Sequence, residues 1–224
     1  MFIDKSMTRD VLTVSPETGI LAAQTLMAQN RIRHLPVVVE DDILVGIVTD
    51  RDIRSAMPAS ILSEAEKASE ERRLAVMKVK DIMTANPVTV SPAQTLEDAL
   101  LMMQNIKVGA FPVVDPEGKL VGIISMRDLT RAFVNVLGLE EPGALLGIVV
   151  EDKLGQMKKI VDAISELGVP FGSILVARVW DEGKRAVFPY LLTSNISKVK
   201  NRLRELGFTL LDPMDWYLDQ LPKR

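Results

Sequence analysis

An internal repeat constrains the fold of this chain more than any other feature of its sequence. When the 224-residue sequence is shifted by 76 positions, residues 7–53 align with residues 83–129 without a gap, and 17 of the 47 aligned positions are identical. Unrelated sequences of ordinary composition would share about three. The first part of the chain therefore contains two copies of one structural unit.

Each copy predicts the order strand, helix, strand, strand, helix from its apolar spacing and its turn residues. In the first helix, Leu26 and Met27 are expected to face inward. One such unit cannot bury both faces of its small sheet, so we expect the two copies to pack together. In the first copy the elements are Val11–Val14, Leu21–Asn30, Leu35–Val39, Leu44–Thr49 and a helix from Arg51, and in the second copy the last helix begins at Arg127.

Composition narrows the classes of function. The formal net charge is −3, which argues against nucleic acid as a partner because phosphate binding needs a surplus of Lys and Arg. The sequence has no cysteine, which excludes disulfides and thiolate metal sites and fits a reducing cytoplasm. Neither a signal peptide nor an apolar run of about 18 residues is present, so we expect a soluble cytoplasmic protein without membrane association.

A seven-residue motif occurs in both copies at the end of the last strand. It reads Gly46-Ile47-Val48-Thr49-Asp50-Arg51-Asp52 in the first and Gly122-Ile123-Ile124-Ser125-Met126-Arg127-Asp128 in the second. With the Met-Thr start, the Thr-Val-Ser-Pro segment and the Pro-Val-Val strand of each copy, the motif resembles the CBS-domain family, in which it binds ribose and phosphate. The resemblance covers roughly residues 1–137 and implies two repeats arranged as a pseudo-twofold pair.

The chemistry of the motif agrees with this resemblance. A carboxylate can accept two hydrogen bonds, which suits the 2′- and 3′-hydroxyls of a ribose. A Thr or Ser hydroxyl at a helix start can bind a phosphate oxygen, and the neighbouring Arg adds a permanent positive charge. The Gly is expected to let the backbone approach closely.

The resemblance also implies two clefts, each with the motif from one repeat and the adenine pocket from the other. The first would join Leu12, Ile32, Arg33, His34 and Pro36 to Ser125, Arg127 and Asp128. The second would join Val88, Val108, Gly109, Ala110 and Pro112 to Thr49, Arg51 and Asp52. Because Arg33-His34 is basic and Gly109-Ala110 is neutral, we expect the first cleft to favour the more phosphorylated ligand.

Simpler roles stay open for several of these residues. His34 could be a packed or hydrogen-bonded histidine, and Asp52 and Asp128 could cap the helices that follow them. Asp41, Asp42 and Asp50 lack the spacing of a metal site and are interpreted as solvated, so no metal is expected. Residues Ser63–Arg73 predict an exposed helix, which is either a solvated spacer or a surface that packs on a partner subunit.

The C-terminal third has a different pattern, β-α-β-β-α-β. Its elements are expected at Ala144–Val150, Gln156–Leu167, Val169–Trp180, Arg185–Leu192, a helix capped by Ser194 or Asn195, and Phe208–Leu211. The order is that of a ferredoxin-like fold and resembles the ACT domain. Asp152 and Gly155 match that family's ligand turn, while Leu154 replaces its Pro. Trp216, Tyr217, Leu218 and Leu221 are expected to pack on their own domain or on a partner subunit.

The complete domain prediction is an α+β protein. It has CBS repeat 1 at 1–57, a helical spacer at 58–79, CBS repeat 2 at 80–138, an ACT-like domain at 143–213 and a tail at 214–224. This arrangement resembles the AcuB-type proteins, and that resemblance implies a link to acetoin utilisation.

The leading hypothesis for function is a non-enzymatic, homodimeric sensor. Its regulatory ligand would be AMP, ADP, ATP or S-adenosylmethionine, without a catalytic cofactor, and its state would pass to the ACT-like domain or to a regulated enzyme. The alternatives are a structural dimerisation module with clefts that bind nothing, and a nucleotide-hydrolysing enzyme. No catalytic triad, Walker loop or dinucleotide-binding loop supports the enzyme.

Overall fold

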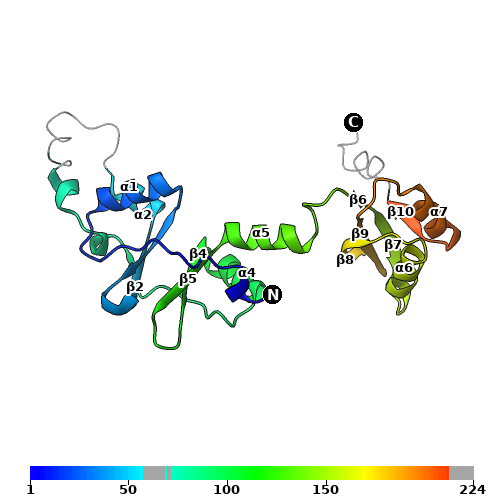
Figure 1. Cartoon of the computed structure of the whole chain (residues 1–224), viewed down its shortest axis with the longest axis horizontal. Coiled ribbons are helices and arrows are strands. Elements are labelled where there is room, and N and C mark those ends of the chain that lie inside the picture. The colour runs from blue at the N-terminus through cyan, green and yellow to red at the C-terminus, as the bar shows by residue number, and fades with distance from the viewer. Residues whose placement is uncertain (58–68, 70–71, 212–224) are drawn as a thin grey trace. The chain divides into compact units, whose positions relative to one another are not determined.

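The computed structural model describes residues 1–57, 69 and 72–211, and the chain divides into two compact units, Met1–Thr130 and Arg131–Arg224 (Figure 1). Most of the spacer and the tail residues Trp216, Tyr217, Leu218 and Leu221 lie outside the described residues. Within the spacer, residues 72–76 are helical. The Arg73 guanidinium donates to the carbonyl of Ala56 at 2.8 Å.

The two repeats have matching α-helices and β-strands, and the last of these helices, α5, extends past Thr130, where the first unit ends. Their starts differ by 76 residues throughout, so the offset found in the sequence holds in three dimensions. The first repeat contains α1 (Ile20–Asn30), β1 (His34–Val38), η2 (Glu40–Asp42), β2 (Leu44–Thr49) and α2 (Asp50–Ala56), and the second contains α4 (Leu96–Ile106), β4 (Ala110–Val114), β5 (Leu120–Ser125) and α5 (Met126–Val136).

One predicted strand is absent as such. The run Val11–Val14 forms only an isolated parallel bridge, between Val14 and Val37, and the second repeat has the same bridge between Val90 and Val113. A turn at Pro16 and Glu17 follows the first run before α1 begins at Ile20, so the run pairs through Val14 alone.

Apolar side chains of α1, β1, β2 and α2 form the core of the first repeat. The fully buried members include Ala23, Leu35, Val37, Val48 and Ile53. Met27 faces this core as the helical spacing predicts, whereas Leu26 is only partly buried at its edge.

The segments that precede the two repeats are exchanged between them. Residues 1–8, with η1 (Ile3–Lys5), lie on the second repeat: the Ile3 amide donates to the Gln94 carbonyl at 2.9 Å. Thr8 forms a bridge with Ile123 of β5. In Figure 1 the dark blue N-terminal segment lies beside α4.

The matching segment before the second repeat lies on the first repeat. The amide of Val79, in η3 (Val79–Asp81), donates to the Thr18 carbonyl at 2.8 Å. The short strand β3 (Thr84–Ala85) pairs with β2 through Gly46 and Ile47. Each contact repeats one of the other segment at an offset of 76, and Ile3 and Val79 are both fully buried. Each repeat therefore completes its sheet and its core with chain that precedes the other.

The two motif glycines accommodate the exchanged segments. A Cβ at Gly46 would lie 2.5 Å from the sulfur of Met83, and a Cβ at Gly122 would lie 2.6 Å from the sulfur of Met7. The close approach expected from these glycines is therefore to a methionine side chain.

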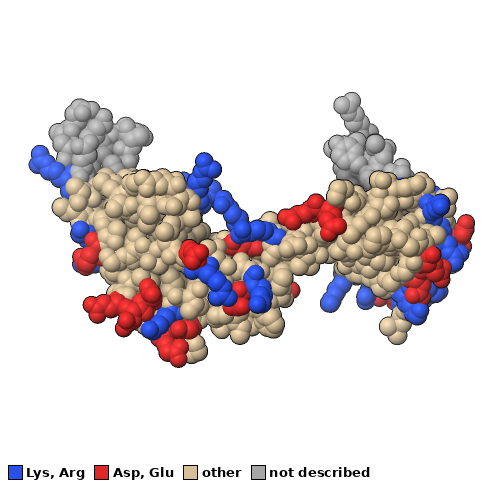
Figure 2. Space-filling view, in the orientation of Figure 1, with Lys and Arg blue, Asp and Glu red and all other residues tan. Residues whose placement is uncertain are grey.

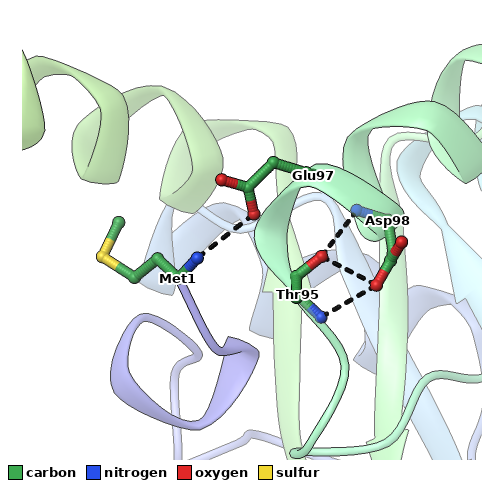
Figure 3. Close-up of polar contacts among 4 residues, drawn as sticks. All are labelled: Met1, Thr95, Glu97 and Asp98. Carbon is green, nitrogen blue, oxygen red and sulfur yellow. Dashed lines mark hydrogen bonds and ion pairs between the residues drawn. The ribbon is translucent and has the colours of Figure 1, made fainter.

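The starts of α1 and α4 differ in one respect. At α4, the Thr95 hydroxyl accepts from the Asp98 amide at 3.1 Å, and the Asp98 carboxylate accepts from the Thr95 amide at 3.2 Å and from its hydroxyl at 2.7 Å (Figure 3). These bonds hold the pKa of Asp98 below its ordinary value. At α1 the corresponding residue is Gly19, which has no side-chain cap.

We expect Thr95→Ala to lower the free energy of unfolding by about 1 kcal/mol, because the first turn of α4 loses its side-chain acceptor. Thermal unfolding measures this loss. The converse pair, Gly19→Thr with Ala22→Asp, would build the same cap on α1, where a Cβ at Gly19 has no neighbour closer than 4.0 Å. This pair should raise stability, and unchanged or lower melting temperatures for it would contradict the comparison.

The second unit follows the element order that the sequence predicts. Its elements are β6 (Ala144–Leu145), β7 (Gly147–Glu151), α6 (Gln156–Ser165), β8 (Phe171–Asp181), β9 (Lys184–Leu191), α7 (Ser197–Glu205) and β10 (Thr209–Leu211). β9 pairs antiparallel with β8 along one edge and with β6 and β7 along the other, and β10 pairs with β7. The Leu146 amide bonds to the Pro189 carbonyl between β6 and β7, so these two act as one interrupted strand.

The core of the second unit lies between this sheet and its two helices. Ile148, Ile160, Ile164 and Leu203 are fully buried there. The N-cap of α7 is Ile196, one or two residues after the predicted Ser194 or Asn195, and the Asn195 side chain accepts from the Ser197 amide at 3.2 Å.

Candidate functional site

Both motif copies place a hydroxyl and a carboxylate together at the start of a helix. In the first repeat, Asp52 Oδ2 accepts from the Thr49 amide at 2.8 Å and from its hydroxyl at 2.7 Å. In the second, Asp128 Oδ2 accepts from the Ser125 amide at 2.9 Å and from its hydroxyl at 2.5 Å. Each hydroxyl also accepts from the amide of its Asp.

These contacts show that both aspartates act as helix-capping residues. The two differ in exposure, because Asp128 is 5% exposed and Asp52 is half-buried. A capping bond does not exclude a ligand, since a carboxylate offers about four acceptor sites. Arg51 and Arg127 are exposed in the first turn of α2 and of α5, beside these caps.

Strand pairing brings the motif next to the pocket strand of the same repeat. His34 pairs with Thr49 across β1 and β2, and Ala110 pairs with Ser125 across β4 and β5. The carbonyls before these residues accept from the helix starts: Arg33 from the Asp50 amide, and Gly109 from the Met126 amide, both at 3.0 Å. The first residues of each pocket strand therefore lie beside their own motif.

His34 also contacts the second repeat. A Cβ at Gly109 would lie 3.2 Å from His34 Nε2, so the ring occupies the space that a larger residue at 109 would fill. The resemblance groups His34 with Asp128, whereas the structure places its ring beside Gly109 and within electrostatic reach of Asp52. Both of these residues belong to the other predicted cleft. The antiparallel pairing of β1 with β2 is the signal that could have revealed this.

The environment of His34 lowers its pKa from the ordinary value of 6.5. Burial is the main cause, Arg33 adds to it, and Asp52 opposes it. The folded protein therefore holds His34 as the neutral imidazole at neutral pH.

We expect acidification to destabilise the protein through His34. Between pH 7.5 and 5.5 the unfolded chain takes up a proton on this residue more readily than the folded chain, so the free energy of unfolding falls as the pH falls. Urea unfolding of the wild type and of His34→Gln at several pH values measures this. Because the chain has one histidine, the wild type should lose more stability than the variant over this range, and parallel curves would contradict the assignment.

Apolar positions of the two predicted adenine pockets are open to solvent. Leu12 is 40% exposed, and Val88, at the matching position, is 50% exposed. Val108 is 37% exposed, and its counterpart Ile32 is half-buried. Pro36 and Pro112 are buried and accept the amides of Val14 and Val90 on their carbonyls, so they tie these bridge residues to β1 and β4.

The two repeats differ where sequence reasoning expected a difference. Arg33 is exposed and His34 is half-buried, whereas Ala110 is 5% exposed. Arg33 and His34 thus correspond to Gly109 and Ala110 in the second repeat, which have no polar side-chain groups.

The turn after β7 carries the other predicted ligand residues, Asp152 and Gly155. The Asp152 carboxylate pairs with Arg185 of β9 through contacts of 2.7 Å and 3.0 Å. Gly155 precedes α6 with a φ of 87°, a conformation that favours glycine. The carboxylate therefore anchors the turn to the sheet.

Charges on the visible face of the second unit are mixed in sign, without a continuous basic surface (Figure 2). Among residues 1–57, 69 and 72–211, no three or more His, Asp or Glu side chains are grouped as metal ligands. In the same part of the chain, no helix is long and apolar enough to cross a membrane.

Comparison with known proteins identifies the class that this pair of repeats defines. The profile of the CBS domain matches residues 3–59 and 79–135, and the chain belongs to the CBS-domain family. It is 34% identical over 137 residues to a CBS domain-containing protein of Dictyostelium discoideum, which covers 61% of this chain and 94% of that protein. It is 40% identical over 121 residues to inosine-5′-monophosphate dehydrogenase of Korarchaeum cryptofilum, covering 54% of this chain and only 22% of the enzyme.

Solved structures agree with the CBS pair. CBSX2 in complex with AMP is 29% identical, has a TM-score of 0.52, and covers 60% of this chain and 97% of its own. The CBS pair of protein MJ0100 in complex with 5′-methylthioadenosine and S-adenosyl-L-methionine is 26% identical with a TM-score of 0.50, covering 59% and 99%. AcuB of Vibrio cholerae, named for acetoin utilization, is 30% identical with a TM-score of 0.52, covering 63% and 98%.

Proposed function

We propose that this protein is a regulatory sensor that binds adenosine-containing ligands in the clefts of its CBS pair. The observation that carries the proposal is that both copies of the motif place a hydroxyl–carboxylate pair at a helix start, α2 or α5, beside the first residues of β1 or β4. Two similar CBS pairs are named as complexes with AMP and with S-adenosyl-L-methionine, which supports this ligand class.

In each cleft the Asp would bind the ribose hydroxyls and the Thr or Ser hydroxyl would face the phosphate. The exposed apolar side chains at Leu12 and Val88 would cover the adenine, whose burial removes them from water. Arg33, which is exposed beside β1, would attract additional phosphates. We therefore propose that the two clefts differ, and that the one beside the exposed Arg33 takes the more highly charged ligand.

The second unit would transmit the bound state. Its β-α-β-β-α-β order and its antiparallel sheet support an ACT-like domain. Within the described residues β8 pairs with β9 alone, and Leu175 and Val176 on it are 46% and 40% exposed. An unpaired apolar edge of this kind can pair with a second copy, so we propose a homodimer that is biased by the ligand.

A regulatory role fits these residues better than catalysis, since the acidic side chains of the motif accept hydrogen bonds within helix caps. The likeness to AcuB supports a role near acetoin utilisation, and we propose an enzyme as the regulated partner. The structural alternative is a dimerisation module with empty clefts, and it predicts that none of these ligands binds.

Calorimetry of the full-length protein with ATP, AMP and S-adenosylmethionine tests the proposal. We expect saturable binding of at least one, with unequal affinity of the two clefts for ATP and no turnover of nucleotide. Absence of binding by all three would favour the structural module. Equal affinity of both clefts for ATP would contradict the proposed asymmetry, and hydrolysis abolished by Asp128→Ala would favour an enzyme.

A further inference from the structure

A cavity of about 520 Å³ lies in the second unit, apart from the CBS pair. It opens where four segments meet: the end of β7, the first turns of α6, the β8–β9 hairpin and the chain that joins α7 to β10. Cavities of roughly 300–1,000 Å³ hold small organic ligands in proteins.

One part of the cavity wall is apolar and held in place. The ring of Trp180 packs edge-to-face on Phe188, with the ring centroids 5.7 Å apart and an interplanar angle of 63°. Phe208 and Leu206 line the cavity from the chain after α7. Such a wall favours a flat or branched hydrocarbon group.

The charged side chains of the cavity are unequally engaged. Glu151 pairs with Lys153 at 2.6 Å, and this contact lowers the pKa of Glu151. Asp181 pairs with Lys184 at 3.5 Å. Lys159 lines the cavity as well, and within the described part of the chain no ion pair or hydrogen bond of its ammonium group is found. The charge left for a ligand is therefore positive.

We propose that this cavity binds a small organic monocarboxylate with an apolar or aromatic group. Its carboxylate would pair with Lys159 and accept from the side-chain amide of Gln156, which lies one turn earlier on the same face of α6. Its apolar group would contact Trp180. An α-amino group would gain little, because both cavity carboxylates already have a lysine partner. The proposal is independent of nucleotide binding by the CBS pair.

Tryptophan fluorescence of the full-length protein tests this site. The chain has two tryptophans, so Trp216→Phe leaves Trp180 as the only reporter. Titration with 3-phenylpropionate should change this fluorescence in a saturable manner, while the neutral 3-phenylpropionamide should bind at least tenfold more weakly. Lys159→Gln should weaken binding of the acid about tenfold or more, whereas Lys158→Gln, which removes the neighbouring lysine that pairs with Asp162, should not.

Three outcomes would overturn the proposal. They are the absence of a saturable change, equal loss in the Lys159 and Lys158 variants, and tighter binding of phenylalanine than of 3-phenylpropionate. A melting temperature for each variant close to that of the parent shows that the fold is intact. Because ATP binding is measured separately on the same samples, failure at this cavity is distinguishable from failure of the CBS clefts.

Discussion

Replacing Asp128 with alanine is expected to weaken adenine-nucleotide binding at one cleft by ten- to a hundredfold and to destabilise the fold by about 1–2 kcal/mol. The affinity loss follows from the value of a hydrogen bond to a charged group, about 1.5–3 kcal/mol. The stability loss follows because the buried Asp128 carboxylate accepts both the amide and the hydroxyl of Ser125 at the start of α5. Calorimetry and urea unfolding measure the two losses on one sample.

A matched variant separates these two effects. Asp98 makes the same set of bonds with Thr95 at the start of α4, outside both predicted clefts. Asp98→Ala should therefore lower stability and leave nucleotide affinity unchanged, and Asp52→Ala should affect the other cleft. If Asp128→Ala and Asp98→Ala bound nucleotide equally well, capping would be the whole role of Asp128.

Adding a single methyl group at Gly122 is expected to destabilise the protein by about 1–3 kcal/mol, the usual cost of overpacking a filled interior. The new Cβ would lie 2.6 Å from the Met7 sulfur and 3.1 Å from the Thr8 carbonyl oxygen, so the segment of residues 1–8 must shift. Gly46→Ala should act in the same way through Met83. Gly19→Ala is the control, because the atom nearest to its new Cβ would be 4.0 Å away.

A double-mutant cycle identifies the cause of the loss at Gly122. Since the closest contact is with the side chain of Met7, shortening that side chain in Met7→Ala should relieve part of the clash, and the two substitutions should cost less together than the sum of their separate costs. Strict additivity in thermal or urea unfolding would mean that the glycine is needed for another reason.

Much of the CBS pair could be predicted from the sequence, because the repeat supplies each element twice. The hairpins of β1 with β2 and of β4 with β5 follow from short apolar runs on either side of polar turns. The run at Val11–Val14 was predicted wrongly as a strand, since β propensity says nothing about whether a partner edge continues beyond one residue.

The exchange of the leading segments could not be predicted, because a repeat with perfect offset is equally compatible with each segment lying on its own repeat or on the other. The position of His34 beside Asp52 and Gly109 was missed for a different reason: the pairing of β1 with β2, which sets His34 opposite Thr49, was not carried over to the clefts. The cavity near Lys159 was also missed, since its lining comes from four segments whose residues share no motif.

The exchange of residues 1–8 and of the matching residues 77–84 has a consequence for how such a molecule can be divided. A fragment that ends before Val79 would lack the chain that covers its own sheet, while its first residues would have no surface to bind. A protein with a single repeat could form the same contacts as a homodimer in which each chain packs its first residues on the other chain. When two such chains are joined end to end, the exchanged contacts become intramolecular. Their stability then no longer depends on the protein concentration.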